Sequence, residues 1–149
     1  MKRTFLATVL SIVFAMVAVA CHSSDEKEIG YAELPVQAQQ FVKQYFPSAT
    51  YSHVEKEKDH GKWEYEVLLS DGTKIDFNNK GEWKSVDCKY STLPVGIIPD
   101  AIVADIAQRY PSQQPYKIEK ETGGYEIDIP GLDLYYSSNG KFIRAEIDR

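Results

Sequence analysis

The sequence predicts an α+β fold made of two tandem units, each a helix followed by a four-stranded antiparallel meander. An apolar-Pro opening and an aromatic-Pro ending frame an amphipathic pattern twice, at residues 34–47 and 98–111. After each frame the apolar period changes from helical to alternating, with Gly-containing turns between short runs. Because such short connections join antiparallel neighbours, we expect both helices to cover one face of the sheet or sheets and to leave the other face open.

The first 20 residues have the pattern of a signal peptide. Lys2 and Arg3 precede an apolar run that ends at Ala20, and the chain becomes polar at His22. A membrane anchor would need about 20 apolar residues, and this run is shorter. We therefore predict an exported protein of the periplasm or outer membrane. Removing the leader takes the formal net charge from −5 to −7, which argues against nucleic acid and anionic lipid surfaces as partners.

Cys21 is the predicted lipidation site. The stretch Ala18-Val19-Ala20-Cys21 resembles a bacterial lipobox, in which the Cys becomes the lipid-modified N-terminus, and residues 21–30 then form a flexible charged tether. The same stretch also fits ordinary signal peptidase, and in that case Cys21 could form a disulfide with Cys88 in the oxidising periplasm. If Cys21 is lipidated, Cys88 is a lone thiol, which we expect to be a small buried hydrophobe.

The first unit covers residues 31–90. Its helix begins near Pro35, which suits a first helical turn, and ends at Pro47. Alternation then places Trp63, Tyr65 and Val67 on one strand face against glutamates on the other. The first expected strand begins between residues 50 and 54 and ends at residue 57. The others are 62–70, 73–78 and 82–89.

A linker of residues 91–97 leads to the second unit, residues 98–149. Its helical frame has the spacing of the first, and Tyr125-Glu126-Ile127 matches Tyr65-Glu66-Val67. Internal repeats of this kind are a strong indication of fold. The expected strands are 115–121, 124–129, 132–137 and 141–147.

These motifs resemble those of a known family. The pattern LPxxAxxFVxxYFP, followed by a YEV strand, a DGT turn and an NxKGEW turn, is similar to that of the PepSY-like, β-lactamase-inhibitor-like (BLIP-like) periplasmic proteins, over about residues 30–148. The resemblance implies two helix-plus-four-strand units side by side, with an open sheet face like the concave surface by which β-lactamase inhibitor proteins hold an enzyme. PepSY modules are also associated with the restraint of peptidases. For this chain, that implication rests on similarity of fold and not on a shared binding site.

The sequence contains no pattern of catalytic residues, so we expect a protein that is not an enzyme and needs no cofactor. Of the three histidines only His53 falls in a structured segment, and a catalytic triad needs a nucleophile and a base oriented by a third group. The His and Cys residues do not cluster as zinc ligands do. Calcium prefers carboxylate oxygens, and neighbouring elements offer Asp71, Asp76, Glu126, Asp128 and Asp133.

The candidate partner-binding residues lie on the predicted open face. Strand parity places acids and one tyrosine opposite the core: Glu64, Glu66, Asp76, Glu126, Asp128, Asp133 and Tyr135. Trp83 and Phe142 hold matching places after the last turn of each unit. They are either core residues or aromatic anchors of an interface.

These observations predict an exported binding protein that uses the open face to hold a protein or peptide of the cell envelope, as an inhibitor of an envelope enzyme such as a peptidase. The alternative is a calcium- or cation-responsive periplasmic protein. We expect a monomer that touches the membrane only through a lipid anchor.

Overall fold

The computed structural model describes residues 26–148, which form one nine-stranded antiparallel sheet with two α-helices. The predicted signal peptide and Cys21 lie outside the described residues. Within the described part, no helix is long and apolar enough to span a membrane. The strands follow one another across the sheet in chain order: β1 (Lys27–Glu28), β2 (Tyr51–Asp59), β3 (Lys62–Leu69), β4 (Lys74–Phe77), β5 (Trp83–Asp87), β6 (Lys117–Glu121), β7 (Gly124–Ile129), β8 (Leu132–Ser137) and β9 (Phe142–Ile147).

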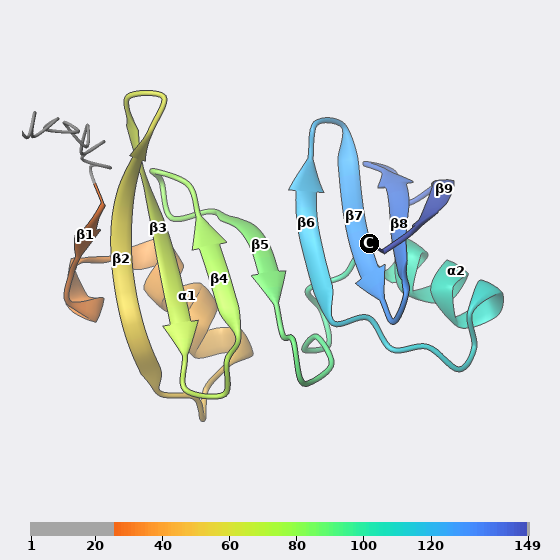
Figure 1. Ribbon diagram of the computed structural model, residues 1–149, viewed down its shortest axis with the longest axis horizontal. Coiled ribbons are helices and arrows are strands. Elements are labelled where there is room, and N and C mark those ends of the chain that lie inside the picture. The colour runs from red at the N-terminus through yellow and green to blue at the C-terminus, as the bar shows by residue number, and fades with distance from the viewer. Residues whose placement is uncertain (1–25, 149) are drawn as a thin grey trace, which may run out of the picture.

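The helices α1 (Val36–Tyr45) and α2 (Asp100–Arg109) lie behind the strands on one side of the sheet (Figure 1). Each begins after a proline N-cap, Pro35 or Pro99. Each ends where the backbone N–H of an aromatic residue, Phe46 or Tyr110, donates to the last helical turn. The helices are therefore two residues shorter at each end than their sequence frames. The frame residues supply the caps.

The core lies between the helices and the sheet. Ala38 and Val42 of α1, and Ile102 and Ile106 of α2, are buried against it. Pairing aligns one apolar row across eight strands, in which every residue but the last is buried: Val54, Val67, Ile75, Val86, Ile118, Ile127, Leu134 and Ala145. Burial of this row stabilises the sheet.

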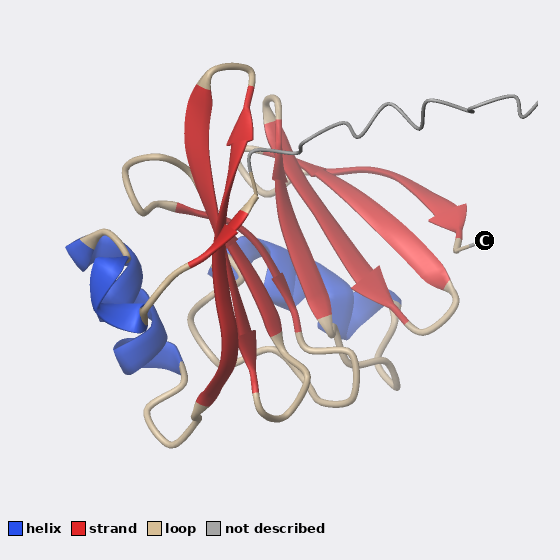
Figure 2. Cartoon of the chain, turned by 60° about the vertical axis from the view of Figure 1, so that its left-hand side comes forward, coloured by secondary structure: helices blue, strands red, loops and turns tan. Residues whose placement is uncertain are grey.

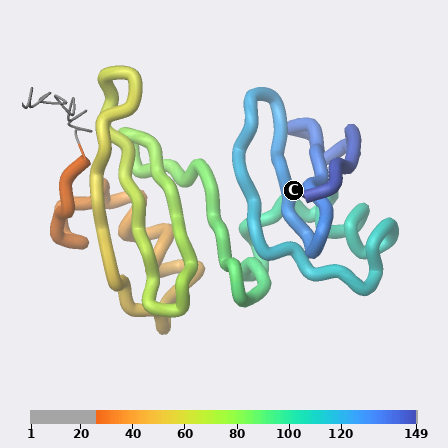
Figure 3. The backbone as a smooth tube through the Cα atoms, in the orientation of Figure 1, coloured from red at the N-terminus to blue at the C-terminus, as the bar shows by residue number. Residues whose placement is uncertain are grey.

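The two halves of the chain share one continuous sheet. β5 pairs with β6 through Ser85 and Glu119, Val86 and Ile118, and Asp87 and Lys117. Figure 3 shows β5 in green alongside β6 in blue, and Figure 2 shows the strands as one twisted layer. The connecting residues 91–97 also contribute to the core, because Ile97 is buried. The open face is thus a single surface.

Part of the expected tether belongs to the sheet. Lys27 and Glu28 pair with Lys56 and Glu55 of β2, and the N–H of Ile29 donates to the carbonyl of Val54 at 2.9 Å. The side chain of Ile29 is buried, and its burial holds this segment against the sheet edge. The prediction of a flexible tether is therefore wrong for residues 27–30, and residues 21–25 lie outside the described residues. A short 3-10 helix, η1 (Tyr31–Glu33), leads into α1.

Candidate functional site

The face away from the helices is a charged surface with two rows of side chains. One row runs from β2 to β9 as Glu55, Glu66, Asp76, Ser85, Glu119, Glu126, Tyr135 and Arg144. The neighbouring row is His53, Leu68, Lys74, Asp87, Lys117, Asp128, Asp133 and Glu146. These positions alternate with the buried residues of the same strands. The six acids and one tyrosine predicted for the open face lie on it in the structure, with Glu64 beside the two rows.

In the first half, lysines neutralise the acids of this face. Lys84 Nζ lies 2.6 Å from Glu64 Oε2, and Lys74 Nζ lies 2.8 Å from Glu66 Oε2. Asp76 accepts a hydrogen bond from Ser85 Oγ at 2.5 Å, while its burial raises the pKa of the carboxyl. These residues line a depression of about 170 Å³, to which Glu119 of β6 also contributes. The depression therefore spans both halves of the chain.

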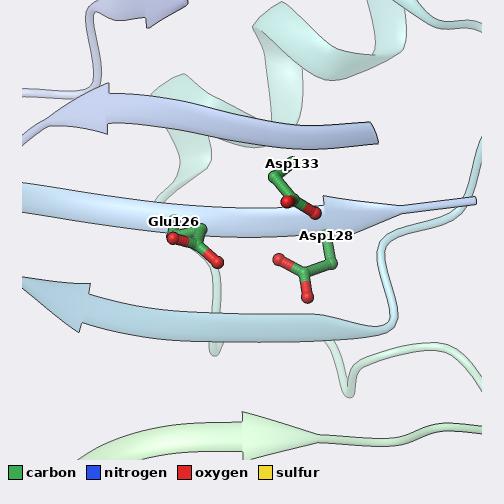
Figure 4. A group of neighbouring side chains, drawn as sticks. All are labelled: Glu126, Asp128 and Asp133. Atoms are coloured by element: carbon green, nitrogen blue, oxygen red, sulfur yellow. The ribbon is translucent and has the colours of Figure 1, made fainter. Parts of the chain in front are cut away.

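In the second half, three carboxylates meet on β7 and β8 (Figure 4). One oxygen each of Glu126, Asp128 and Asp133 lies within 4.8 Å of the others. Glu126 and Asp128 share a face because they are two residues apart on β7, and Asp133 is the cross-strand partner of Asp128. The tight turn between β7 and β8 brings Asp128 and Asp133, which are five residues apart in the sequence, next to each other.

Asp128 is the unusual member of this cluster, since it is only 7% exposed. Its Oδ1 is buried and has no hydrogen-bond partner among the described residues, while Oδ2 lies 3.3 Å from Lys117 Nζ. Burial raises the pKa of Asp128 to about 6, and the attraction of Lys117 offsets only part of that effect. Burial would also lower the pKa of Lys117, but Asp128, Glu119 and Glu126 raise it overall. The Lys117 ammonium is thus the shared counter-charge of three acids, Glu119, Glu126 and Asp128.

Strand pairing allows a position-by-position comparison of β2–β5 with β6–β9. Asp128 occupies the place that Leu68 holds in the first half, and Asp133 the place of Lys74. Lys74 supplies its own cation to Glu66, whereas Asp133 adds a third negative charge beside Glu126. The second half therefore concentrates carboxylates where the first half balances them.

The structure corrects the assignment of two aromatic residues to the partner-binding face. Trp83 packs on the helix side, 6.1 Å between ring centroids from Phe41 of α1, with Lys120 Nζ 3.9 Å from its ring. Phe142 lies beneath Arg109 of α2, whose guanidinium is 4.1 Å from the ring. Of the two alternatives left by the sequence, the structure shows packing against the core. A bulge directly after each residue, at Lys84 and at Ile143, changes the parity that the sequence suggests.

The remaining candidate residues, His53, Cys88 and Asp71, make contacts that support the fold. His53 Nε2 donates to Glu55 Oε2 at 2.8 Å, and His53 Nδ1 lies 3.7 Å from Glu28 Oε1, so this side chain links β1 to β2. The hydrogen bond to Glu55 raises the pKa of His53. Cys88 is buried, and burial raises the pKa of its thiol, as expected of a small core residue. Asp71 accepts the N–H of Thr73 at 2.9 Å in the turn after β3 and does not join the carboxylate cluster.

Three basic residues of the open face were missed by the sequence analysis. Lys84 reaches the face only because the irregularity between β4 and β5 places it beside Ser85, and no sequence signal marked that bulge. Lys117 and Arg144 follow simple strand parity, which could have identified them. Arg144 stacks on Tyr135, with its guanidinium 3.6 Å from the ring.

Comparison with known proteins gives consistent results. The family described as "Putative beta-lactamase-inhibitor-like, PepSY-like" matches residues 63–144. None of the curated proteins compared matches the chain.

Three solved structures with the same fold come from Bacteroides species. A "putative calcium-regulated periplasmic protein" of Bacteroides thetaiotaomicron is 34% identical, with 82% of this chain and 97% of that chain covered and a TM-score of 0.79. Two "putative periplasmic" proteins of Bacteroides vulgatus are 34% and 31% identical, cover 83% and 81% of this chain and 98% of their own, and have TM-scores of 0.79 and 0.78. These relatives indicate export to the periplasm, as the leader predicts.

Proposed function

Because the chain belongs to the β-lactamase-inhibitor-like, PepSY-like family, which indicates a non-enzymatic periplasmic protein, we propose that it is a binding protein whose open sheet face holds a protein or peptide of the cell envelope. The observation that carries this proposal is the continuity of that face. The β5–β6 pairing joins both halves into one surface, and both helices lie on its other side (Figure 1).

The chemistry of the face favours a partner with basic side chains. Acids outnumber bases in both rows, and the central depression is lined by Glu57, Glu64, Glu66, Asp76 and Glu119 with only two lysines. A lysine or arginine entering the depression would compete with Lys74 and Lys84 for carboxylates already held near 2.6–2.8 Å from an ammonium. Inhibition of an envelope enzyme, such as a peptidase or a β-lactamase, would follow if that partner is an enzyme.

Affinity capture from an envelope extract tests this proposal. The bait is the chain from residue 22, which contains every described element, and the face variant changes the outward acids Glu57 and Glu119 to Lys. Asp128 is left unchanged because a lysine at its buried position would be destabilising. We expect the wild type to retain a protein that the face variant loses.

The matched control changes Glu33 and Asp100 to Lys, which makes the same change in net charge in η1 and α2, away from the open face. It should retain the same protein as the wild type. Equal retention by the face variant, or loss from both variants, would show that the face is a solvated surface only.

A second candidate function is a response to calcium. It is favoured by the three carboxylates of Glu126, Asp128 and Asp133, by the unpartnered Oδ1 of Asp128, and by the name of the relative in Bacteroides thetaiotaomicron. Calcium takes six to eight oxygen ligands, commonly carboxylates completed by water. A divalent ion here would replace the Lys117 ammonium as the counter-charge of the cluster.

Asp133→Lys tests the calcium proposal by installing the residue of the first half. Calcium should raise the thermal midpoint of the wild type relative to a chelator, and Asp133→Lys should abolish the increase. Asp76→Asn, which removes a carboxylate outside the cluster, should retain it. An increase that survives Asp133→Lys would place the ion elsewhere.

We also propose that Cys21 carries a lipid anchor and that the two halves arose by tandem duplication. The matched helix frames and the equivalent pairing of β2–β5 and β6–β9 support the duplication. Mass spectrometry of the mature N-terminus tests the anchor: a diacylated Cys21 is expected, and an unmodified N-terminus at residue 21 or 22 would indicate ordinary cleavage.

A further inference from the structure

The two ends of the sheet differ. At one end the two-residue strand β1 covers the edge of β2. At the other end β9 has six residues and pairs on one side only, with β8. All but the first residue of β9 are exposed, including Ile143 at 57% and Ile147 at 76%. A long edge strand with exposed apolar side chains is a template for pairing with another strand.

The main-chain groups of β9 that point outward can be identified. Asp148 N–H donates to Gly131 O at 3.2 Å, and these residues are opposite each other in the register of β8 and β9. Hydrogen bonding alternates along an antiparallel pair. Glu146 therefore directs its main-chain groups towards β8, whereas Ala145 and Ile147 direct theirs to the open edge.

The same position is already occupied in the first half. Ser85, Val86 and Asp87 of β5 are the equivalents of Arg144, Ala145 and Glu146, and they pair with β6. Val86 is buried there, whereas Ala145 is exposed at the end of the aligned apolar row. β9 thus stops where the first half is continued by another strand.

We propose that the partner of β9 is the β9 strand of a second copy of this chain. In an antiparallel two-fold pair with Ala145 opposite Ala145 of the partner subunit, the outward main-chain groups of both strands meet. Arg144 then faces Glu146 of the partner subunit twice, within the regularly paired part of β9. Opposite charges directly across a strand pair are stabilising.

Neighbouring two-fold registers lack this complementarity. A shift of one residue towards the N-terminus places Arg144 opposite Arg144 of the partner subunit, and a shift towards the C-terminus places Glu146 opposite Glu146 of the partner subunit. Like charges directly opposite are destabilising. The charge pattern therefore selects a single register, in which the apolar row and the open face continue from one subunit into the next. This proposed dimer differs from the monomer expected from the sequence.

Sedimentation equilibrium of the chain from residue 22 tests the pairing, from about 1 µM to about 1 mM because a two-strand interface is small. We expect reversible dimers in the wild type. Arg144→Glu and Glu146→Arg should each weaken self-association at least tenfold. Both positions are exposed, so the folded state should be retained, which a thermal melt checks.

Mixing the two single variants provides the decisive measurement. Arg144→Glu and Glu146→Arg chains should form a heterodimer with each other, and a chain carrying both changes should recover self-association. Lys62→Glu, with the same charge change in the distant β2–β3 hairpin, should dimerise as the wild type does. A wild type that remains monomeric at about 1 mM, or single variants that dimerise unchanged, would overturn the proposal.

Discussion

The two halves of this protein place different chemistry on closely matched frames. On the helix side, Phe41 and Phe77 pack edge to face with centroids 5.8 Å apart. Their equivalents in the second half are Asp105 and Tyr136, joined by a hydrogen bond of 2.8 Å from the Tyr136 hydroxyl. An apolar contact and a polar one therefore occupy the same place between helix and sheet.

The open face differs in the same way. Leu68 and Lys74 in the first half correspond to Asp128 and Asp133 in the second, so one half is balanced internally and the other carries an excess of buried negative charge. The comparison indicates that the frame tolerates exchange of paired residues on either face. It also locates the residues most suited to a ligand in the second half.

The largest expected effect concerns the two equivalent turns, one in each half, that pack against the start of a helix. Gly81 (φ 83°) and Gly140 (φ 79°) lie against the helix N-termini, where an added Cβ would come within 2.7 Å of Pro35 Cβ or 2.8 Å of Ala101 Cβ. Gly81→Ala and Gly140→Ala should each lower the free energy of unfolding by about 2–4 kcal/mol, measured by urea denaturation.

Gly123→Ala is the matched control. Gly123 also has a positive φ, 85°, but a Cβ there meets nothing within 4 Å. It should lose only about 1 kcal/mol, for the backbone strain alone. If Gly81→Ala and Gly140→Ala lower the free energy of unfolding by no more than Gly123→Ala does, close contact between each turn and its helix is not a stabilising feature shared by the two halves.

The next effect concerns the buried carboxylate. Asp128→Leu installs the residue of the first half, and it should raise the free energy of unfolding by about 1–2 kcal/mol at pH 7.5. The folded pKa of about 6 lies above the unfolded value. The wild type should therefore be most stable with Asp128 protonated and should lose stability as the pH rises from about 4 to about 6.

In Asp128→Leu this loss should be reduced, as followed by thermal melts across that pH range. The reverse exchange, Leu68→Asp, should lower stability at pH 7.5 and do so less at pH 4. An unchanged pH profile in Asp128→Leu would contradict the assignment of the raised pKa to this residue.

The smallest effect is expected on the helix side. Tyr136→Phe should lower the free energy of unfolding by about 1 kcal/mol, because the hydroxyl loses its bond to Asp105 while Asp105 keeps its contacts with Arg109, 3.0 Å away. Pairing Tyr136→Phe with Asp105→Phe restores the apolar contact of the first half. A double-mutant cycle should then show favourable coupling between the two phenylalanines, and independent effects would contradict the equivalence.

Much of the fold could be predicted because its signals are local. The apolar-Pro and aromatic-Pro frames placed both helices, and alternation placed β2–β9 within about three residues. The resemblance to the PepSY-like family is confirmed. The open-face acids also followed from parity, since successive strand residues point to opposite faces.

The errors arose where spatial contacts overrule a local pattern. Lys27 and Glu28 have a polar sequence typical of a tether, yet they pair with β2 because burial of Ile29 holds them there. Trp83 and Phe142 directly precede register shifts that parity cannot detect. For the same reason, the sequence did not indicate that Lys84 and Ser85 share the open face.

The sequence by itself determined the order of helices and strands and the acidic character of one sheet face. The reason is that the spacing of apolar and charged residues along a short segment defines its secondary structure and its two faces. Tertiary structure alone decided which charges meet. The β5–β6 pairing made one surface of two halves, and the packing around β7 buried Asp128 beside Glu126, Asp133 and a single lysine. Burial and proximity depend on neighbours distant in the chain, and these turn an acidic strand into a candidate binding site.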